Sequence, residues 1–125
     1  MVGALLLPPT EQGSVAGIIF FNNSGTLGMC GHGLIGVVET LRHLGRLTPG
    51  THCFDTPAGR VQATLEESGG VSFVGVPSWL EVRDFALDVP GVGRVRGDIA
   101  YGGNWFYLVR DPHYDITLER ARDLT

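Results

Sequence analysis

The stretch Gly28-Met29-Cys30-Gly31-His32-Gly33-Leu34-Ile35-Gly36 constrains this chain more than any other part of the sequence. Four of its nine residues are glycine, and a thiol and an imidazole lie two positions apart between them. Apolar residues then recur at spacings of three and four, which predicts an amphipathic helix from about Gly33 to Leu44. Gly45 ends the predicted helix. The thiol therefore lies on a loop that leads into a helix N-terminus.

This placement of Cys30 has chemical consequences. Free backbone N–H groups at a helix N-terminus bind anions, and the positive end of the helix dipole favours a thiolate over a thiol. We expect Cys30 to face a cleft within hydrogen-bonding distance of the first helical turn. A reactive thiol beside an anion pocket indicates acid–base or nucleophilic chemistry on a substrate that carries a carboxylate. The alternative is that Cys30 is a small buried hydrophobe, the commonest role of a single cysteine.

The rest of the chain has the pattern of short strands. Val2–Leu7 and Val15–Phe21 are apolar runs that we expect to pair in antiparallel fashion. Alternating runs separated by glycine and proline turns predict further hairpins over residues 59–109, and a helical pattern begins again at Thr117. One helix among about eight strands indicates an α+β fold, with residues 1–125 as a single domain.

Composition excludes several classes of protein. The hydrophobic share of 43% and the charged share of 18% are typical of a globular chain. A net charge of −4, with no basic run, argues against a nucleic-acid partner. No apolar run reaches the roughly 18 residues of a membrane span, so no membrane partner is expected. Two cysteines, one of them in a glycine-rich loop, suit a reducing cytoplasm better than a disulfide scaffold.

Several motifs resemble signatures of the proline racemase family. Gly28-Met29-Cys30-Gly31-His32-Gly33 resembles its first catalytic-cysteine motif, and Gly97-Asp98-Ile99-Ala100-Tyr101-Gly102-Gly103-Asn104-Trp105-Phe106 resembles a second family signature. Pro49–His52 and Asp55–Gly59 also fit the family pattern in order and spacing. Trp105 is closer to the 4-hydroxyproline 2-epimerase branch than to proline racemase proper.

The resemblance implies a fold and an activity. The fold would be one half of a diaminopimelate-epimerase-like fold, with mostly antiparallel strands around a central helix. The activity would be inversion at Cα of 4-hydroxyproline by two cysteines, without metal or other cofactor, and Cys30 would be one of the two bases.

The resemblance also implies a set of substrate-binding residues. The backbone N–H groups of Gly31, His32 and Gly33 would bind the substrate carboxylate, and the glycines would permit its close approach. Asp98 and Asn104 would line the same pocket. Each polar residue could instead have a purely structural role: His32 could bond a loop carbonyl, and Asp98 and Asn104 could cap turns.

One departure from the family pattern concerns the second cysteine. Family members are longer and carry it within D-R-S-P-C-G-T-G, whereas Cys53 lies in His52-Cys53-Phe54-Asp55 without glycines or a following helical pattern. We therefore expect an N-terminal catalytic half, truncated at both ends and inactive alone. Its partners would be a small amino-acid substrate and the missing C-terminal half, with a homodimer left open.

Four alternative functions remain. Within the family these are proline racemisation and 3-hydroxyproline dehydration, although dehydratases of that type usually carry Thr or Ser at the position of Cys30. Outside it, Gly31, Gly33 and Gly36 formally match the dinucleotide fingerprint G-x-G-x-x-G, with Asp55 at about the right distance. A zinc site is the fourth alternative, and its ligands would be Cys30, His32, His52 and Cys53.

Overall fold

The fold was analysed in a computed structural model that describes residues 1–109 and 117–119. The chain divides into two compact units. The first unit comprises Met1–Trp79 and Tyr101–Trp105, and the second comprises Leu80–Ala100 and the described part of Phe106–Thr125. The helical pattern expected from Thr117 to Leu124 falls mostly on residues 120–124, which lie outside the described residues.

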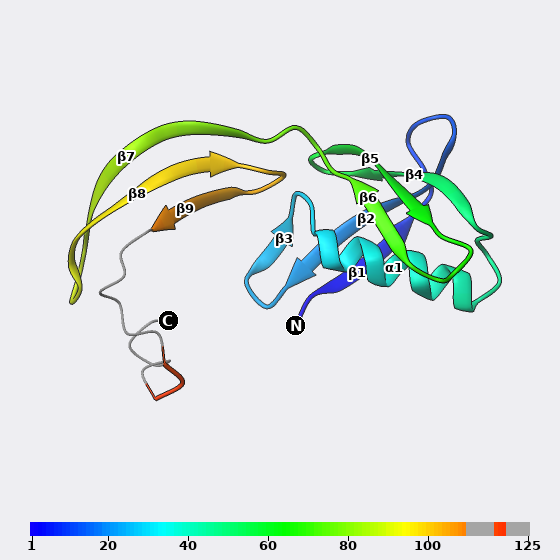
Figure 1. Ribbon diagram of the computed structural model, residues 1–125, viewed down its shortest axis with the longest axis horizontal. Coiled ribbons are helices and arrows are strands. Elements are labelled where there is room, and N and C mark those ends of the chain that lie inside the picture. The colour runs from blue at the N-terminus through cyan, green and yellow to red at the C-terminus, as the bar shows by residue number, and fades with distance from the viewer. Residues whose placement is uncertain (110–116, 120–125) are drawn as a thin grey trace. The chain divides into compact units, whose positions relative to one another are not determined.

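A six-stranded sheet forms the first unit together with one helix (Figure 1). Its strands are β1 (Gly3–Leu7), β2 (Ser14–Asn22), β3 (Gly25–Leu27), β4 (Gly50–Thr56), β5 (Gly59–Leu65) and β6 (Val71–Val74). The strand order is β1-β2-β4-β5-β6, and β3 pairs with β2 beside this path. The predicted antiparallel pairing of the first two strands is confirmed, since Leu5 opposes Ile19 in the β1–β2 ladder.

Strands β2 and β4 run parallel, unlike the other described pairs of this sheet. A parallel pair needs a crossover connection, which here contains the helix α1 (Gly31–His43). The helix begins two residues before the predicted Gly33, and Leu44 is its C-cap. Gly45 follows with φ +65°, a left-handed conformation that favours glycine, so the predicted end of the helix is confirmed.

The core lies between α1 and the sheet. One stripe of the helix, formed by Leu34, Val37, Val38 and Leu41, is buried, as the three-and-four spacing predicts. On β5 every second side chain is buried, because successive strand residues point to opposite faces. Phe20, Phe54 and Leu34 are completely or almost completely inaccessible and fill the centre. The first unit therefore has the two packed layers that a folded domain needs.

The second unit consists of a three-stranded sheet in the order β7-β8-β9. Its strands are β7 (Trp79–Val89), β8 (Gly93–Tyr101) and β9 (Trp105–Val109), whose ends at Trp79, Tyr101 and Trp105 count with the first unit. Short turns join consecutive strands, so they run antiparallel. With α1 as the one helix of the described residues and strands elsewhere, the predicted α+β class is confirmed.

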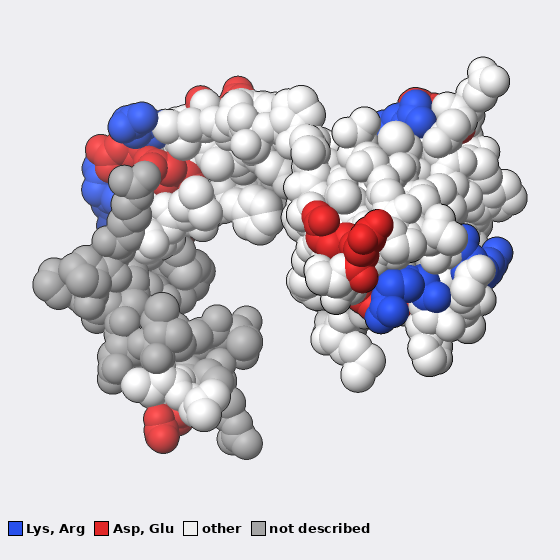
Figure 2. All heavy atoms as spheres, turned by 45° about the vertical axis from the view of Figure 1, so that its right-hand side comes forward, with Lys and Arg blue, Asp and Glu red and all other residues white. Residues whose placement is uncertain are grey.

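Two observations concern membranes and surface charge. Within the described residues, no helix combines the length and apolarity that a membrane crossing requires. On the face that Figure 2 shows, arginine and acidic side chains fall into small separate groups. No continuous basic surface extends over the described part of that face.

Candidate active site

Cys30 lies at the N-terminus of α1, as predicted from the sequence, and the structure makes it the N-cap residue. Its backbone is extended, with φ −143° and ψ 109°, and its carbonyl accepts the first helical hydrogen bond from the Leu34 N–H at 2.9 Å. The thiol makes no capping hydrogen bond. The first-turn N–H groups therefore receive nothing from the cap side chain and are available to an anion.

The expectation that Cys30 faces an open cleft is wrong. Only 8% of the residue is exposed, and it belongs to the same buried cluster as Met29, Phe20 and Leu34. The reason is geometric: the chain enters α1 with the N-cap side chain turned toward the core. A Cβ atom built on Gly33 would lie 3.2 Å from the Cys30 sulfur, so the thiol lies directly against Gly33 in the first turn of α1.

His32 provides a polar contact for the buried thiol. The Cys30 sulfur lies 3.7 Å from Nδ1 and 3.8 Å from Nε2 of this imidazole, which is itself exposed. Because the two distances are nearly equal, the ring presents both nitrogens to the sulfur at long hydrogen-bonding range. An imidazole beside a thiol can take up or return its proton, and an imidazolium stabilises the thiolate. The pair connects the buried sulfur to the surface.

Gly31 and Gly33 are required by packing. A Cβ on Gly33 would lie 2.9 Å from the Phe20 ring, and one on Gly31 would lie 2.7 Å from the Phe73 ring. The family resemblance assigns these glycines to the approach of a substrate carboxylate. The structure gives a different reason, because aromatic side chains already occupy the space where the two Cβ atoms would be.

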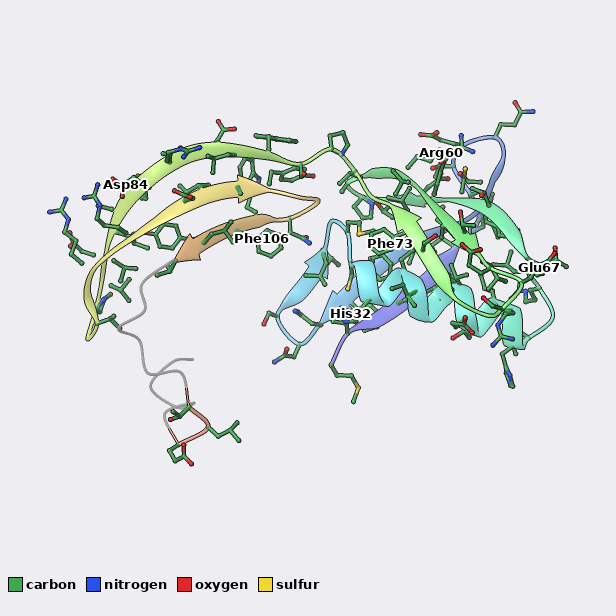
Figure 3. All side chains as sticks on the ribbon, viewed as in Figure 1. His32, Arg60, Glu67, Phe73, Asp84 and Phe106 are labelled. Atoms are coloured by element: carbon green, nitrogen blue, oxygen red, sulfur yellow. The ribbon has the colours of Figure 1, made fainter. Side chains whose placement is uncertain are left out.

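Phe73 is a site residue that sequence reasoning missed. It lies on β6, is 39% exposed, and places its ring tip against the first residue of α1. Figure 3 labels Phe73 and His32 near the N-terminal end of this helix. An exposed aromatic residue in a short hairpin strand gives little signal in the sequence, since its partner is more than forty positions away.

A pocket of about 350 Å³ lies beside His32. It is lined by Val2, Gly3, Ala4 and Leu6 from the β1 segment and by a face of α1 that includes His32, Gly33 and Gly36. A Cβ on Gly36 would meet nothing within 4 Å. Cys30 does not line this pocket, so His32 is the group through which the thiol and the pocket are connected.

Asn104 contacts the loop that carries Cys30. Its Oδ1 accepts a hydrogen bond from the Gly28 N–H at 2.8 Å, and its Nδ2 donates one to the Met29 carbonyl at 2.7 Å. The predicted site residue is thus brought to the Cys30 loop. Both ends of its amide are bonded to backbone.

Asp98 lies in the second unit and is 8% exposed. Its Oδ1 accepts a hydrogen bond from the Asp84 N–H at 2.9 Å. Asp84 has φ +55°, a conformation that few residues other than glycine adopt, and Asp and Asn tolerate it best. This contact stabilises an irregular point of β7, in line with the structural alternative for Asp98.

Asp55 is a buried carboxylate that stabilises a loop. Its oxygens accept hydrogen bonds from the Thr10 N–H and hydroxyl, the Glu11 N–H and the Ser14 hydroxyl. The Ser14 hydroxyl is the largest cause, and the Glu11 and Thr10 donors add to it, so that the pKa of Asp55 falls to about 2 although burial opposes the shift. The carboxylate fastens the β1–β2 loop to β4.

The dinucleotide alternative is wrong. Gly31, Gly33 and Gly36 lie inside α1, whereas the fingerprint needs its first glycines in the tight turn before a helix. The ribose-binding role is also blocked, because both oxygens of Asp55 are occupied by Thr10, Glu11 and Ser14.

The four residues of the zinc alternative do not converge. Over residues 1–109 and 117–119, no three His, Cys, Asp or Glu side chains come together in a way that could hold a metal ion. His52 uses its Nε2 in a 2.8 Å contact with the Thr48 carbonyl. Cys53 lies within β4 between β2 and β5, and both thiols are free.

Comparison with known families agrees with the sequence motifs. The sequence profile described as proline racemase matches residues 1–125, the whole chain. The chain belongs to the proline racemase family. Membership accounts for the joint presence of the Cys30 loop and the Asn104 segment, which are two separate motifs in the sequence and are in contact in the fold.

Curated relatives in this family carry a common name. A protein named 4-hydroxyproline 2-epimerase from Burkholderia cenocepacia is 58% identical over 125 residues, which is all of this chain and 40% of that protein. A protein of the same name from Pseudomonas aeruginosa is 59% identical over 109 residues, 87% of this chain and 35% of the relative. The chain thus spans about two fifths of the length of these relatives.

Solved proline racemase family structures have the same fold. A hydroxyproline epimerase from Agrobacterium vitis, with bound trans-4-hydroxy-L-proline, has a TM-score of 0.83 at 26% identity. A probable proline racemase from Agrobacterium radiobacter, with bound carbonate, has a TM-score of 0.82 at 27% identity. Each match covers 97% of this chain and 38% of the other.

Proposed function

We propose that this chain provides the Cys30-bearing half of a cofactor-independent amino-acid epimerase that inverts Cα of 4-hydroxyproline. The observation that carries the proposal is the 58% identity, over all 125 residues, to a 4-hydroxyproline 2-epimerase. The chemistry of the site supports it, because Cys30 caps α1 and its sulfur lies 3.7 Å from the His32 imidazole.

The proposed reaction removes and returns one proton at Cα. The Cys30 thiolate takes the proton from one face, and the electron pair of the broken C–H bond moves into the substrate carboxylate. Backbone N–H groups of Gly31, His32 and Gly33 stabilise the charge that develops on the carboxylate oxygens. An acid on the opposite face then protonates Cα, so the reaction needs no oxidant and no leaving group.

The opposite acid is not supplied by Cys53. That residue lies in the middle of β4, paired with Gln62, and caps no helix. We assign the opposite acid to a second cysteine in the remainder of an enzyme-length protein. Loss of one of two proton-transfer groups typically costs about 10²–10⁴-fold in rate. The 125-residue chain alone should therefore show no measurable epimerisation.

A chimera tests the proposal. Residues 1–125 would replace the aligned segment of the Burkholderia cenocepacia relative, and polarimetry would follow trans-4-hydroxy-L-proline. We expect turnover by the chimera, its loss in Cys30→Ser, and its retention in the matched variant Cys53→Ser. A folded chimera that keeps its activity after Cys30→Ser would refute the assignment of Cys30.

Proline is the substrate of the second candidate function. The likeness to a probable proline racemase, with a TM-score of 0.82, favours it, and the same chimera assayed with L-proline decides between the two. Faster turnover of proline than of hydroxyproline would make proline racemase the proposed function in place of hydroxyproline epimerase. Elimination of water from 3-hydroxyproline would instead indicate the dehydratase branch.

Location and assembly are parts of the same proposal. Cys30 and Cys53 are both free thiols, which suits a reducing compartment, and we assign the protein to the cytoplasm. That residues 1–125 act as one catalytic half, and that the whole protein forms a homodimer, stay predictions.

A further inference from the structure

Two glycines allow the Asn104 segment to lie directly on the Cys30 loop. A Cβ on Gly28 would lie 2.1 Å from the Gly103 carbonyl oxygen, and a Cβ on Gly103 would lie 2.6 Å from the Met29 Cβ. Gly103 also has φ +89°. A side chain at either position would separate the two segments, so the contact is built for backbone-to-backbone approach.

The polar groups of the loop before α1 are bonded from three directions. Asn104 accepts a hydrogen bond from the Gly28 N–H and donates one to the Met29 carbonyl. The Ala58 N–H donates to the Gly28 carbonyl at 3.1 Å. The Cys30 carbonyl accepts the Leu34 N–H. Two of these four bonds come from one side chain. Asn104 is therefore the residue on which the position of the Cys30 backbone depends most.

Asn104 is itself held in place. The Gly102 N–H donates to the Asn104 carbonyl at 3.0 Å, which closes the turn before β9. A side-chain amide can accept from one backbone group and donate to another at the same time. Both ends of the Asn104 amide are used in this way, so the side chain cannot turn toward a substrate without breaking bonds to the Cys30 loop.

We propose that Asn104 is a positioning residue that fixes the Cys30 loop and does not bind substrate. By bridging Gly28 and Met29, it sets where the next residue, Cys30, begins α1. Its effect on catalysis rests on the proposed function, whereas its effect on the loop does not. A base misplaced by about 1 Å can cost roughly 10²-fold in rate, so a bridge of this kind matters for proton transfer.

The first test uses the 125-residue chain and its own two thiols. Cys30 and Cys53 are alkylated with iodoacetamide under native conditions, and the ratio of their rates is read by peptide mapping. In Asn104→Ala we expect the Cys30:Cys53 ratio to rise about tenfold, the change in local opening that two ordinary hydrogen bonds account for. Asn23→Ala, at an exposed asparagine in the β2–β3 turn, is the matched control and should keep the wild-type ratio.

Urea denaturation of the same variant separates local release from general destabilisation. Because Cys30 is buried and Cys53 is partly exposed, local release is a rise in the ratio larger than the loss of global stability explains. An unchanged ratio in Asn104→Ala, whatever the absolute rates, overturns the proposal.

Asn104→Asp is the second variant. At neutral pH its carboxylate can accept from Gly28 but cannot donate to Met29, whereas a protonated carboxyl can do both. Deuterium uptake in the peptide that contains Gly28 should exceed that of wild type at neutral pH and approach it at about pH 3, where an ordinary aspartic acid is mostly protonated. Uptake equal to wild type at both pH values would contradict the bridge.

In the chimera the two roles of Asn104 give different kinetics. A positioning residue lowers kcat and leaves KM nearly unchanged, while a substrate ligand raises KM. A rise in KM with unchanged kcat would overturn the proposal. If the chimera has no epimerase activity, the proposed function fails, and the thiol ratio still decides the role of Asn104.

Discussion

The first and the second unit bury their apolar side chains to very different degrees. In the first, Phe20, Phe54 and Leu34 are fully buried between α1 and the sheet. In the second, Phe85 and Phe106 are 42% and 50% exposed, and Val95 is the buried apolar side chain of its described strands. Strand patterning is similar in both, so burial depends on the layer that covers the sheet.

The comparison also separates two ways of holding a strand in place. The first unit uses packing, with polar groups such as Asp55 fixing its loops. The second relies on hydrogen bonds, among them those of Asp98 to Asp84 and of the Tyr107 hydroxyl to the Phe85 and Val95 carbonyls. We therefore expect substitutions in the first unit to have the larger effects on stability.

The largest difference in stability is expected between Phe→Ala substitutions in the two units. Phe20→Ala leaves a cavity at a completely buried position and should lower the free energy of unfolding by about 3–5 kcal/mol. Phe106→Ala removes a half-exposed ring and should cost less than about 1 kcal/mol. Urea denaturation of both variants measures the difference. Equal losses would show that the second unit is as well packed as the first.

Two glycines of α1 sharpen the comparison within the first unit. Gly33→Ala places a methyl group 2.9 Å from the Phe20 ring and should destabilise by about 1–3 kcal/mol. Gly36→Ala enters open space and should stabilise by about 0.5–1 kcal/mol, since alanine is the better helix former. Thermal melts of the pair test this. The same sign of effect at both positions would contradict the packing described for Gly33.

The pH dependence of stability should come mainly from Asp55. Because its folded pKa of about 2 lies below the ordinary 3.8, its contribution is complete above about pH 4 and is lost as the pH falls toward 2. Asp55→Asn should cost about 1–3 kcal/mol at neutral pH and flatten this acid limb.

Asp84→Asn in the second unit is the matched control. Its carboxylate pairs with Arg96 at 2.5 Å, which lowers the pKa of Asp84, but both side chains are more than half exposed. Solvent screens such a pair, so the acid limb should persist in this variant. If Asp84→Asn instead removes the loss of stability between about pH 4 and pH 2, the responsible carboxylate is Asp84 in the second unit and not Asp55.

The most local effect is expected at Tyr107. Tyr107→Phe removes the hydroxyl that bonds the Phe85 and Val95 carbonyls and should cost about 0.5–1.5 kcal/mol locally. Hydrogen exchange should accelerate in β7–β9 and stay unchanged in β2, β4 and β5. Acceleration across both sheets would mean that the two units open as one.

Sequence and structure contributed different parts of the site. The glycine-rich run and its apolar spacing placed Cys30 at a helix N-terminus, because helix periodicity and the glycine that follows the helix are local properties of the chain. The same reasoning predicted the first hairpin, β1 with β2, for which neighbouring runs suffice. It did not find the short strand β3, whose three residues carry no pattern.

What the sequence alone determined about this protein is therefore its α+β class, the helix with Cys30 on the loop that leads into it, and the motifs of the proline racemase family. The tertiary structure decided that Cys30 is buried, that Phe73 covers Gly31, that Asp55 fastens a distant loop, and that Asn104 bridges Gly28 and Met29. The contacts of Phe73, Asp55 and Asn104 each join residues more than forty positions apart in the sequence. No local pattern encodes such contacts, because they depend on how the strands order themselves within the sheet and on which side chains then meet.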